Sequence, residues 1–396
     1  MMKLDVVKVG IVGLGLVSDS HIKAFRSHPH AEVIAVCDQN EKLAKSVAQK
    51  YGVPKYYSSY EEMLKDPDIN TIDIATPTFL HKSMVIAAAK AGKNIQCEKP
   101  FCLTMEECTA ACEEAEKQGV SLAVDESYIF MSSIKKAREL IDAGMIGKPQ
   151  QIRQRFGEWV ERDDVMDDRE IADGHGWRMD SKKAGGAGFP WMFDHFVHFF
   201  ATAEYLMNDS KVNEVYSLKS DLSWMKNKKI ETKMDLYGVN EAGDIPIMVW
   251  TYEDSACQGV WMRAELLNGK YDSMTGFSAV IIGDKGMIEV LGEGGGGLQY
   301  DGKAVHLVLH RKDGKTETFR FDEGPDDVWK SEVSYYSQAH INHIHEMADR
   351  LVNGKPPVYS GIDGTWAVKA TMAAICSVKE GKPVKVKDVT DERYMK

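Results

Sequence analysis

The sequence lacks the features that assign a protein to several specialised classes. Its seven cysteines include no C-x-x-C pair, which argues against a disulfide framework and favours reduced thiols. No apolar stretch approaches the ~20 residues of a membrane-spanning helix, so we expect no membrane partner. The first predicted strand begins near residue 8. We therefore expect no signal peptide and a cytoplasmic location.

Long basic runs are also missing. Acidic residues outnumber basic ones by 60 to 49, and the formal net charge is −11. No run of lysines or arginines is long enough to follow a phosphate backbone, so we expect no nucleic-acid partner. With 396 residues, of which 43% are hydrophobic and 28% charged, the chain has a globular composition and is too long for one core. It therefore predicts two domains.

The sequence does contain a glycine turn between two apolar runs near its start. Residues 8–12 predict a strand, Gly13 and Gly15 shape the turn, a helix-like segment follows, and residues 33–36 predict a second strand that ends at Asp38. This order of strand, glycine turn, helix, strand and acid is typical of a dinucleotide site. Gly13 permits the tight turn, and Gly15 lets the backbone approach a pyrophosphate at the helix N-terminus.

The acid at the end of the second strand predicts which dinucleotide binds. Asp38 lies 23 residues after Gly15, near the usual spacing, and its carboxylate can accept hydrogen bonds from both ribose hydroxyls. A 2′-phosphate would meet that carboxylate, and the next two residues supply no positive charge. We therefore predict NAD rather than NADP, with Leu16 and Val17 beside the glycines in the cofactor site.

The pattern of strands and helices divides the chain near residue 128. Residues 71–77, 94–100 and 121–125 predict strands, and residues 82–91 and 104–118 predict helices. This alternation predicts an α/β fold, with a doubly wound parallel sheet of the Rossmann type over residues 1–128.

Long strand-like segments dominate the remainder, so residues 129–396 predict a second α/β domain with a large, mostly antiparallel open sheet. The predicted strands are residues 151–160, 212–223, 245–252, 258–265, 278–291 and 304–311, and the predicted helices are residues 334–353 and 365–380. Polar residues 162–190 are typical of a lid or binding loop.

Two short segments carry side chains suited to moving a proton. Glu98-Lys99-Pro100 ends a predicted parallel strand, at the edge where open sheets bind ligands. Asp194 and His198 lie one turn apart on a helix that we expect Asp194 to open, so they can hold a sugar diol or form an oriented base. Each segment alone is ambiguous, because such a tripeptide is usually a surface turn and such an aspartate usually a helix cap.

Together these segments resemble the glucose–fructose oxidoreductase and inositol dehydrogenase (Gfo/Idh/MocA) family, whose members carry Glu-Lys-Pro after the fifth strand and Asp-x-x-x-His in the second domain. The resemblance extends over nearly the whole chain. It implies that Lys99, Asp194 and His198 are the catalytic residues, that a cis bond precedes Pro100, and that Glu98 lies against the nicotinamide ribose. The implied cofactor residues are Gly13, Gly15, Leu16, Val17, Asp38, Thr76, Pro77, His81, Glu98 and Lys99.

The chemistry of lysine and histidine leaves the identity of the base open. A free lysine has a pKa of ~10.4, about three units too high for a base at neutral pH, whereas histidine starts near ~6.5. Burial beside a cationic nicotinamide would disfavour the charged ammonium and bring the lysine pKa closer to neutral pH. We assign exchange of the hydroxyl proton to His198 and orientation of that imidazole and of the sugar to Asp194. Lys99 is assigned a hydrogen bond to the reacting oxygen and the relay of the proton. The reverse assignment of the base stays open.

Aromatic residues near the expected substrate predict a sugar ring. Trp159, Trp177 and Trp191 offer faces to such a ring, although each is equally well explained as a core residue. Glu126 and Tyr128 stand where many members of the family have Asn and Arg. The predicted substrate residues are Lys99, Glu126, Tyr128, Trp159, His175, Trp177, Trp191, Asp194, His195 and His198.

The sequence predicts no metal site. His340, His343 and His345 occur on one predicted helix, but that helix also carries an apolar core stripe, so we expect exposed or capping histidines. The stripe comprises Ile341, Ile344, Met347 and Leu351. Cys108 and Cys112 lack a second pair of ligands.

The leading hypothesis is an NAD-dependent oxidoreductase that oxidises a ring secondary alcohol of a sugar or glycoside, at C3, to a ketone. An inositol 2-dehydrogenase is the alternative among enzymes, and a non-catalytic NAD- or sugar-sensing regulator is the alternative outside them. The resemblance further implies a homo-oligomer, either a dimer or a tetramer. The family also includes members that retain NAD between turnovers.

Overall fold

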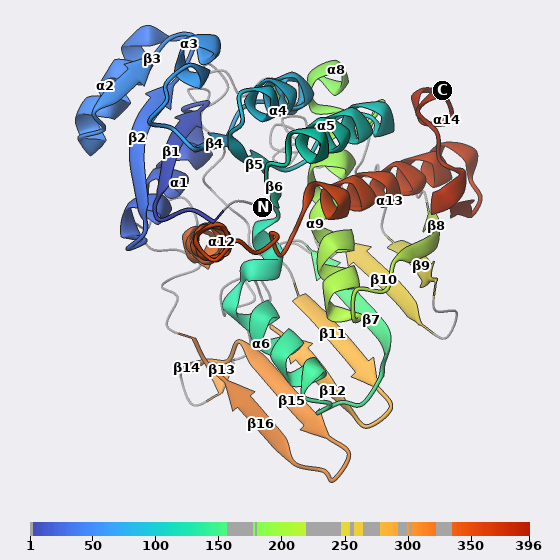
Figure 1. Cartoon of the computed structure of the whole chain (residues 1–396). Coiled ribbons are helices and arrows are strands. Elements are labelled where there is room, and N and C mark those ends of the chain that lie inside the picture. The colour runs from blue at the N-terminus through green and yellow to red at the C-terminus, as the bar shows by residue number, and fades with distance from the viewer. Residues whose placement is uncertain are drawn as a thin grey trace, which may run out of the picture. The chain divides into compact units, whose positions relative to one another are not determined.

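The computed structural model describes most of the chain, and its contacts divide the chain into two compact units (Figure 1). The described residues are 3–156, 177–178, 180–218, 247–253, 257–263, 278–291, 299–300, 303–321 and 335–396. The first unit comprises Met1–Ser127, Lys182–Ala184 and His340–Val368, and the second comprises Tyr128–Ser181, Gly185–Ala339 and Lys369–Lys396.

The first unit contains a six-stranded parallel sheet in the order β3-β2-β1-β4-β5-β6. Its strands are β1 (Val7–Val12), β2 (Ala31–Cys37), β3 (Lys55–Tyr57), β4 (Thr71–Ile74), β5 (Asn94–Glu98) and β6 (Leu122–Asp125). The strand order reverses between β1 and β4, which is the point where such sheets bind a nucleotide. The predicted doubly wound Rossmann sheet is confirmed.

Helices alternate with the strands of this sheet. The sequence predicts three of them, after the glycine turn and over residues 82–91 and 104–118, and does not predict the others. The helices are α1 (Leu16–Ser27), α2 (Glu41–Tyr51), α3 (Tyr60–Leu64), the 3₁₀ helix η1 (Thr78–Leu80), α4 (His81–Lys90) and α5 (Met105–Gln118). At the start of α5 the Thr104 side chain accepts the Glu107 N–H at 3.2 Å. Gly119 ends that helix with φ of 68°. Local capping therefore determines where α5 begins and ends.

A helix near the end of the chain completes the core of the first unit. In α12 (Tyr335–Val352), Ile344, Met347 and Leu351 are buried in one apolar cluster with Ile11 of β1 and Phe25 of α1. Ile341 packs against that cluster. The predicted apolar stripe is thus confirmed, and it brings residues from the last quarter of the sequence into the first unit.

The histidines on α12 do not match the prediction of exposed or capping side chains. His340 is 1% exposed and His343 is 2% exposed, so the prediction is wrong for both. His345 is half-buried, and its Nε2 lies 3.2 Å from the Ala24 carbonyl oxygen. The α12 face that turns toward the core is wider than its apolar stripe and includes these imidazoles.

The second unit contains a nine-stranded sheet in the order β16-β15-β12-β11-β7-β10-β9-β8-β17. Among the pairs that the described strands form within this sheet, the β7–β10 pair is parallel and the others are antiparallel. The strands are β7 (Pro149–Phe156), β8 (Val212–Leu218), β9 (Ile247–Tyr252), β10 (Gln258–Arg263), β11 (Ser278–Gly283), β12 (Gly286–Val290), β15 (Leu307–Arg311), β16 (Thr316–Phe319) and β17 (Val384–Lys385). The predicted mostly antiparallel sheet is confirmed.

Several predicted strands are longer than the strands that the structure describes. Residues 278–291 form two strands, because the turn at Asp284 and Lys285 folds them into the hairpin β11–β12. Residues 157–160, 219–223, 245–246 and 264–265 lie outside the described residues. A separate two-stranded sheet pairs β13 (Gln299–Tyr300) with β14 (Lys303–Ala304).

The other helical segments complete the described chain. They are η2 (Ser127–Phe130), α6 (Ser132–Asp142), α8 (Ser181–Ala184), α9 (Pro190–Leu206), α13 (Gly361–Glu380), η5 (Val386–Asp388) and α14 (Asp391–Met395). Over the residues that the structure describes, every helix is too short or too polar to cross a bilayer.

A bidentate ion pair connects α14 to the end of α13. Arg393 Nε and Nη2 lie 2.7 Å and 2.9 Å from the two carboxylate oxygens of Glu380. Hydrogen bonds from Arg393 lower the pKa of Glu380 from 4.5 to about 2. A carboxyl whose pKa is lower in the folded state stabilises that state above its unfolded pKa, and this stabilisation is lost as the pH falls.

We expect Glu380→Gln to lower the free energy of unfolding by about 0.5–1 kcal/mol at pH 7, because the pair is only partly shielded from solvent. The difference from the parent protein should shrink as the pH falls from 4.5 toward 2, measured by denaturant unfolding. Glu392→Gln is the control, since its pair with Lys396 is highly exposed. A deficit that does not change with pH would contradict the assignment.

Candidate functional site

Gly13 is held so closely by the neighbouring strands that no other residue fits. Its φ is 88°, and its N–H donates to the Cys37 carbonyl oxygen at 3.0 Å. A Cβ at this position would lie 2.6 Å from the Ala75 carbonyl oxygen. The turn after β1 is therefore fixed against the ends of β2 and β4, as the sequence predicts for Gly13.

Gly15, unlike Gly13, borders open space. A Cβ built on Gly15 would meet no atom within 4 Å. Gly15 is the N-cap of α1, and no side chain caps that helix end. The first N–H groups of a helix lack intrahelical partners, so those of α1 can bind a phosphate over the open space at Gly15. Ser18 lies against the turn, and its hydroxyl donates to the Gly15 carbonyl oxygen at 2.7 Å.

Asp38 lies beside this turn, directly after β2. Its Oδ2 accepts the Leu14 N–H at 3.0 Å, and its Oδ1 accepts the Asn40 N–H at 2.9 Å. These bonds fix the carboxylate, and each of its oxygens keeps a further lone pair for a ribose hydroxyl. The turn and this carboxylate therefore fit the pyrophosphate and adenosine ribose of NAD.

His81 connects two strand ends at the same edge of the sheet. The imidazole is fully buried, and its nitrogens lie 2.8 Å from the Thr76 carbonyl oxygen and 3.0 Å from the Pro100 carbonyl oxygen. Burial lowers the pKa of His81. The imidazole thus joins the segment after β4 to the segment after β5. Direct contact of His81, Thr76 and Pro77 with the cofactor stays a prediction.

Glu98 is the last residue of β5, and Lys99 and Pro100 follow it. The Lys99–Pro100 peptide bond is cis, as the resemblance implies. One carboxylate oxygen of Glu98 accepts the Lys99 N–H at 3.0 Å, and the other lies 3.2 Å from His21 Nε2. The Glu98 side chain is thus directed toward the interior of the first unit. Its contact with the nicotinamide ribose stays a prediction.

Helix α9 carries the predicted carboxylate and imidazole of the second unit. It begins at Pro190, one turn earlier than predicted, so the expectation that Asp194 opens the helix is wrong. Proline is common at the first position of a helix, and this signal was available in the sequence. Asp194 and His198 remain one turn apart and share a face.

Arg178 contacts Asp194, although sequence reasoning did not select it. Arg178 Nη1 lies 3.6 Å from Asp194 Oδ2, and His195 Nδ1 lies 3.7 Å from the same oxygen. The Arg178 guanidinium also lies 5.4 Å from the centre of the Trp177 ring. The carboxylate of Asp194 is therefore flanked by two basic side chains. No spacing motif in the polar segment distinguishes Arg178 from its neighbours.

The imidazole of His198 is held by a stacked ring. Its centroid lies 4.2 Å from that of Tyr128, and the ring planes differ by 13°. Both residues are buried, at 4% and 7% exposed. A predicted catalytic residue and a predicted substrate residue thus pack on each other, and the stack fixes the plane of the imidazole.

The other predicted substrate residues do not all lie in one place. Trp191 is 8% exposed and stacks on His195, with ring centroids 4.6 Å apart. Glu126 is 1% exposed and belongs to the first unit. Trp159 and His175 lie outside the described residues. The structure therefore brings Trp177, Trp191, Asp194 and His195 into one network of contacts with Arg178.

Comparison with known proteins identifies the class. Residues 7–126 match a domain described as "Oxidoreductase family, NAD-binding Rossmann fold", and residues 138–386 match one described as "Oxidoreductase family, C-terminal alpha/beta domain". The chain therefore belongs to the Gfo/Idh/MocA oxidoreductase family, and NAD is its cofactor.

Two curated relatives align over nearly their full length. The myo-inositol 2-dehydrogenase of Thermotoga maritima is 25% identical over 383 residues, covering 97% of this chain and 99% of the relative. The scyllo-inositol 2-dehydrogenase (NAD(+)) of Bacillus subtilis is 28% identical over 382 residues, covering 96% of each. A levoglucosan dehydrogenase solved with NADH and levoglucosan shares the fold, with a TM-score of 0.72, 19% identity, and coverage of 96% of this chain and 99% of that one.

The open space at Gly15 predicts a variant that folds but binds NAD poorly. Gly15→Ala should change the free energy of unfolding by less than about 1 kcal/mol, since the methyl group meets nothing in the protein. NAD should bind at least about tenfold more weakly, because the methyl group occupies the path of the pyrophosphate. Titration calorimetry on cofactor-free protein measures the affinity.

Gly13→Ala is the matched comparison. Its Cβ clashes with the Ala75 carbonyl oxygen and requires a positive φ, so we expect a loss of about 1–3 kcal/mol in stability before any effect on binding. If Gly15→Ala bound NAD as tightly as the parent protein, the pyrophosphate would not pass over Gly15.

Proposed function

We propose that this protein is an NAD-dependent dehydrogenase of a sugar or cyclic polyol, which oxidises a ring secondary alcohol to a ketone. The observation that carries the proposal is Lys99 at the carboxyl end of β5, in a domain that carries the glycine turn and Asp38. Support also comes from the relatives, which include two inositol dehydrogenases aligned over nearly their whole length.

The reaction requires transfer of a hydride and release of a proton. Bound NAD⁺ supplies the hydride acceptor. We assign to His198 the exchange of the hydroxyl proton, to Asp194 the orientation of the substrate and of that imidazole, and to Lys99 a hydrogen bond to the reacting oxygen. The Tyr128 ring holds the plane of His198. Lys99 is the alternative base.

For the substrate we propose a hexose or glycoside oxidised at C3. The stacking of Trp191 on His195 and the contact of Trp177 with Arg178 support this choice, because aromatic faces and polar edges suit a sugar ring. A fold neighbour was solved with levoglucosan. The second candidate is an inositol 2-dehydrogenase, and it is supported by the two relatives of that activity.

One preparation tests these alternatives. The absorbance spectrum of the purified protein shows whether it retains a bound nicotinamide cofactor. The protein is then freed of cofactor. Hexoses, inositols and glycosides are each tested as substrates with NAD⁺. Formation of NADH and a 3-keto product supports the proposed substrate, and oxidation of inositol alone supports the second candidate. Binding of NAD and sugar without turnover identifies a sensing regulator instead. NADP⁺ used as efficiently as NAD⁺ would contradict the role of Asp38.

We propose that the enzyme acts in the cytoplasm, and that it forms a homo-oligomer, either a dimer or a tetramer, as the resemblance to the family implies. Light scattering on the purified protein measures the number of subunits. A monomer at the concentration used for the assay would exclude the oligomer.

A further inference from the structure

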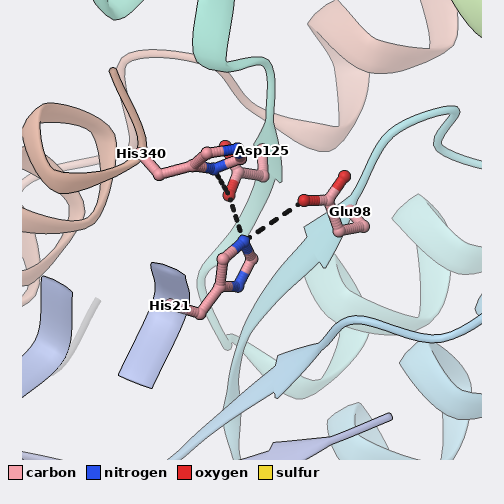
Figure 2. Close-up of side chains that lie close together, drawn as sticks. All are labelled: His21, Glu98, Asp125 and His340. Carbon is pink, nitrogen blue, oxygen red and sulfur yellow. Dashed lines mark hydrogen bonds and ion pairs between the residues drawn. The ribbon is translucent and has the colours of Figure 1, made fainter. Parts of the chain in front are cut away.

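Four ionisable side chains from separate elements meet inside the first unit (Figure 2). They are His21 on α1, Glu98 on β5, Asp125 on β6 and His340 on α12, and they are between 0% and 6% exposed. One nitrogen or oxygen atom of each lies within 4.8 Å of those of the others. Figure 2 shows the His21 ring directed at both carboxylates, with the His340 ring beside Asp125.

Three of the separations among these atoms are close to those between ligands of one metal ion, and all of the atoms lie within 4.8 Å of one another. His21 Nε2 lies 3.1 Å from Asp125 Oδ2 and 3.2 Å from Glu98 Oε1, and His340 Nδ1 lies 3.3 Å from Asp125 Oδ2. Ligands about 2.0–2.1 Å from a tetrahedral zinc ion are separated from one another by about 3.3–3.5 Å.

The other nitrogen of His21 indicates which atom faces the cluster. Nδ1 lies 2.8 Å from Asp73 Oδ2, and because a carboxylate oxygen only accepts, Nδ1 carries the hydrogen. In a neutral ring, Nε2 then presents a lone pair to Glu98 and Asp125. Nε2 of His21 and Oε1 of Glu98 form no hydrogen bond of acceptable geometry within the described residues. A carboxylate bound to the outer nitrogen of a ligand histidine is the common support of a zinc site.

The charge balance is compatible with a divalent ion. Asp73, Glu98 and Asp125 bring three carboxylates into the interior, and the groups paired with them are imidazoles. Buried carboxylates are costly unless they are paired with positive charge or bind a metal. A proton on His21 would supply one positive charge, whereas a divalent ion supplies two and uses the lone pair of Nε2.

We propose that His21, Glu98, Asp125 and His340 bind one structural zinc ion. Two imidazoles and two carboxylates are ligands that zinc accepts in a four-coordinate site. Asp73 orients His21, and the Gln96 amide donates to Asp125 Oδ2 at 3.3 Å. This site replaces the sequence-based expectation of no metal. None of its ligands is assigned to proton exchange, and Glu98 is the one ligand that it shares with the predicted cofactor site.

The test uses the full chain without a polyhistidine tag, produced in medium that contains zinc. Elemental analysis by mass spectrometry should find about one zinc ion per chain, as expected of a closed four-ligand site. After removal of zinc with a chelator, Co²⁺ should restore thermal stability and give the visible bands of tetrahedral cobalt. These measurements need no variant, so a folding defect cannot obscure the result.

Two variants connect the ion to the proposed ligands. His340→Gln and Asp125→Asn should each lose the zinc and the cobalt bands. His310→Gln should keep both, because His310 pairs with Glu289 in the second unit. Parent protein with no zinc above that of a metal-free control protein, and no cobalt spectrum, would overturn the proposal and assign the cluster to a protonated His21. Retention of zinc in both ligand variants would overturn it as well.

Discussion

Replacing Lys99 with methionine should lower kcat by about 10²–10⁴-fold on the substrate that the panel identifies, the usual size of a lost proton-transfer or hydrogen-bonding group. We expect the fold to be retained, because the backbone N–H of residue 99, which donates to the Glu98 carboxylate, is present in the variant. NAD should still bind with similar affinity. Formation of NADH measures turnover, and calorimetry measures binding.

Two further lysine variants complete this experiment. Lys90→Met removes an exposed lysine at the end of α4 and should leave kcat unchanged. Lys99→Arg retains a permanent positive charge that cannot act as a base, so substantial activity would favour a hydrogen-bonding role for Lys99. Normal turnover of Lys99→Met would remove lysine from the mechanism.

The second large effect is expected at His198. His198→Phe keeps a planar ring to stack on Tyr128 but loses both nitrogens, so we expect a folded protein with kcat lowered by about 10²–10⁴-fold. A base must be deprotonated to act, so the rate of the parent enzyme rises with pH as the base titrates. The profile of the variant should lose that rise if His198 is the base.

His310→Phe is the matched control for this substitution, because it makes the same chemical change at a histidine on β15 with no assigned role. Its kcat and pH profile should equal those of the parent enzyme. An unchanged pH profile in His198→Phe, together with lost activity in Lys99→Met, would transfer the role of base to Lys99.

Local sequence signals predicted the parts of the fold that depend on neighbouring residues. The glycine turn and the alternation of strands with helices act within short segments, so they predicted the parallel sheet and its nucleotide edge. The membership of His340–Val368 in the first unit depends on packing between residues far apart in the sequence. No local pattern carries that information.

The same distinction explains the candidate site. Gly13, Gly15 and Asp38 follow a fixed spacing, whereas the direction of the Glu98 side chain depends on His21, which lies on another element. Arg178 reaches Asp194 from a different segment of the chain. The four proposed zinc ligands come from four elements with no short spacing between them, unlike the paired ligands of common zinc motifs. Reasoning from one helix therefore treated His340 as a surface residue.

The position of α12 has a consequence for biosynthesis. The apolar cluster beside β1 includes Ile344, Met347 and Leu351, which leave the ribosome long after the cofactor-binding strands have been made. The nascent chain therefore exposes part of this core through most of translation. A nucleotide-binding half that is synthesised first thus reaches its final packing near the end of synthesis, and a truncated gene encoding it alone would yield an aggregation-prone product.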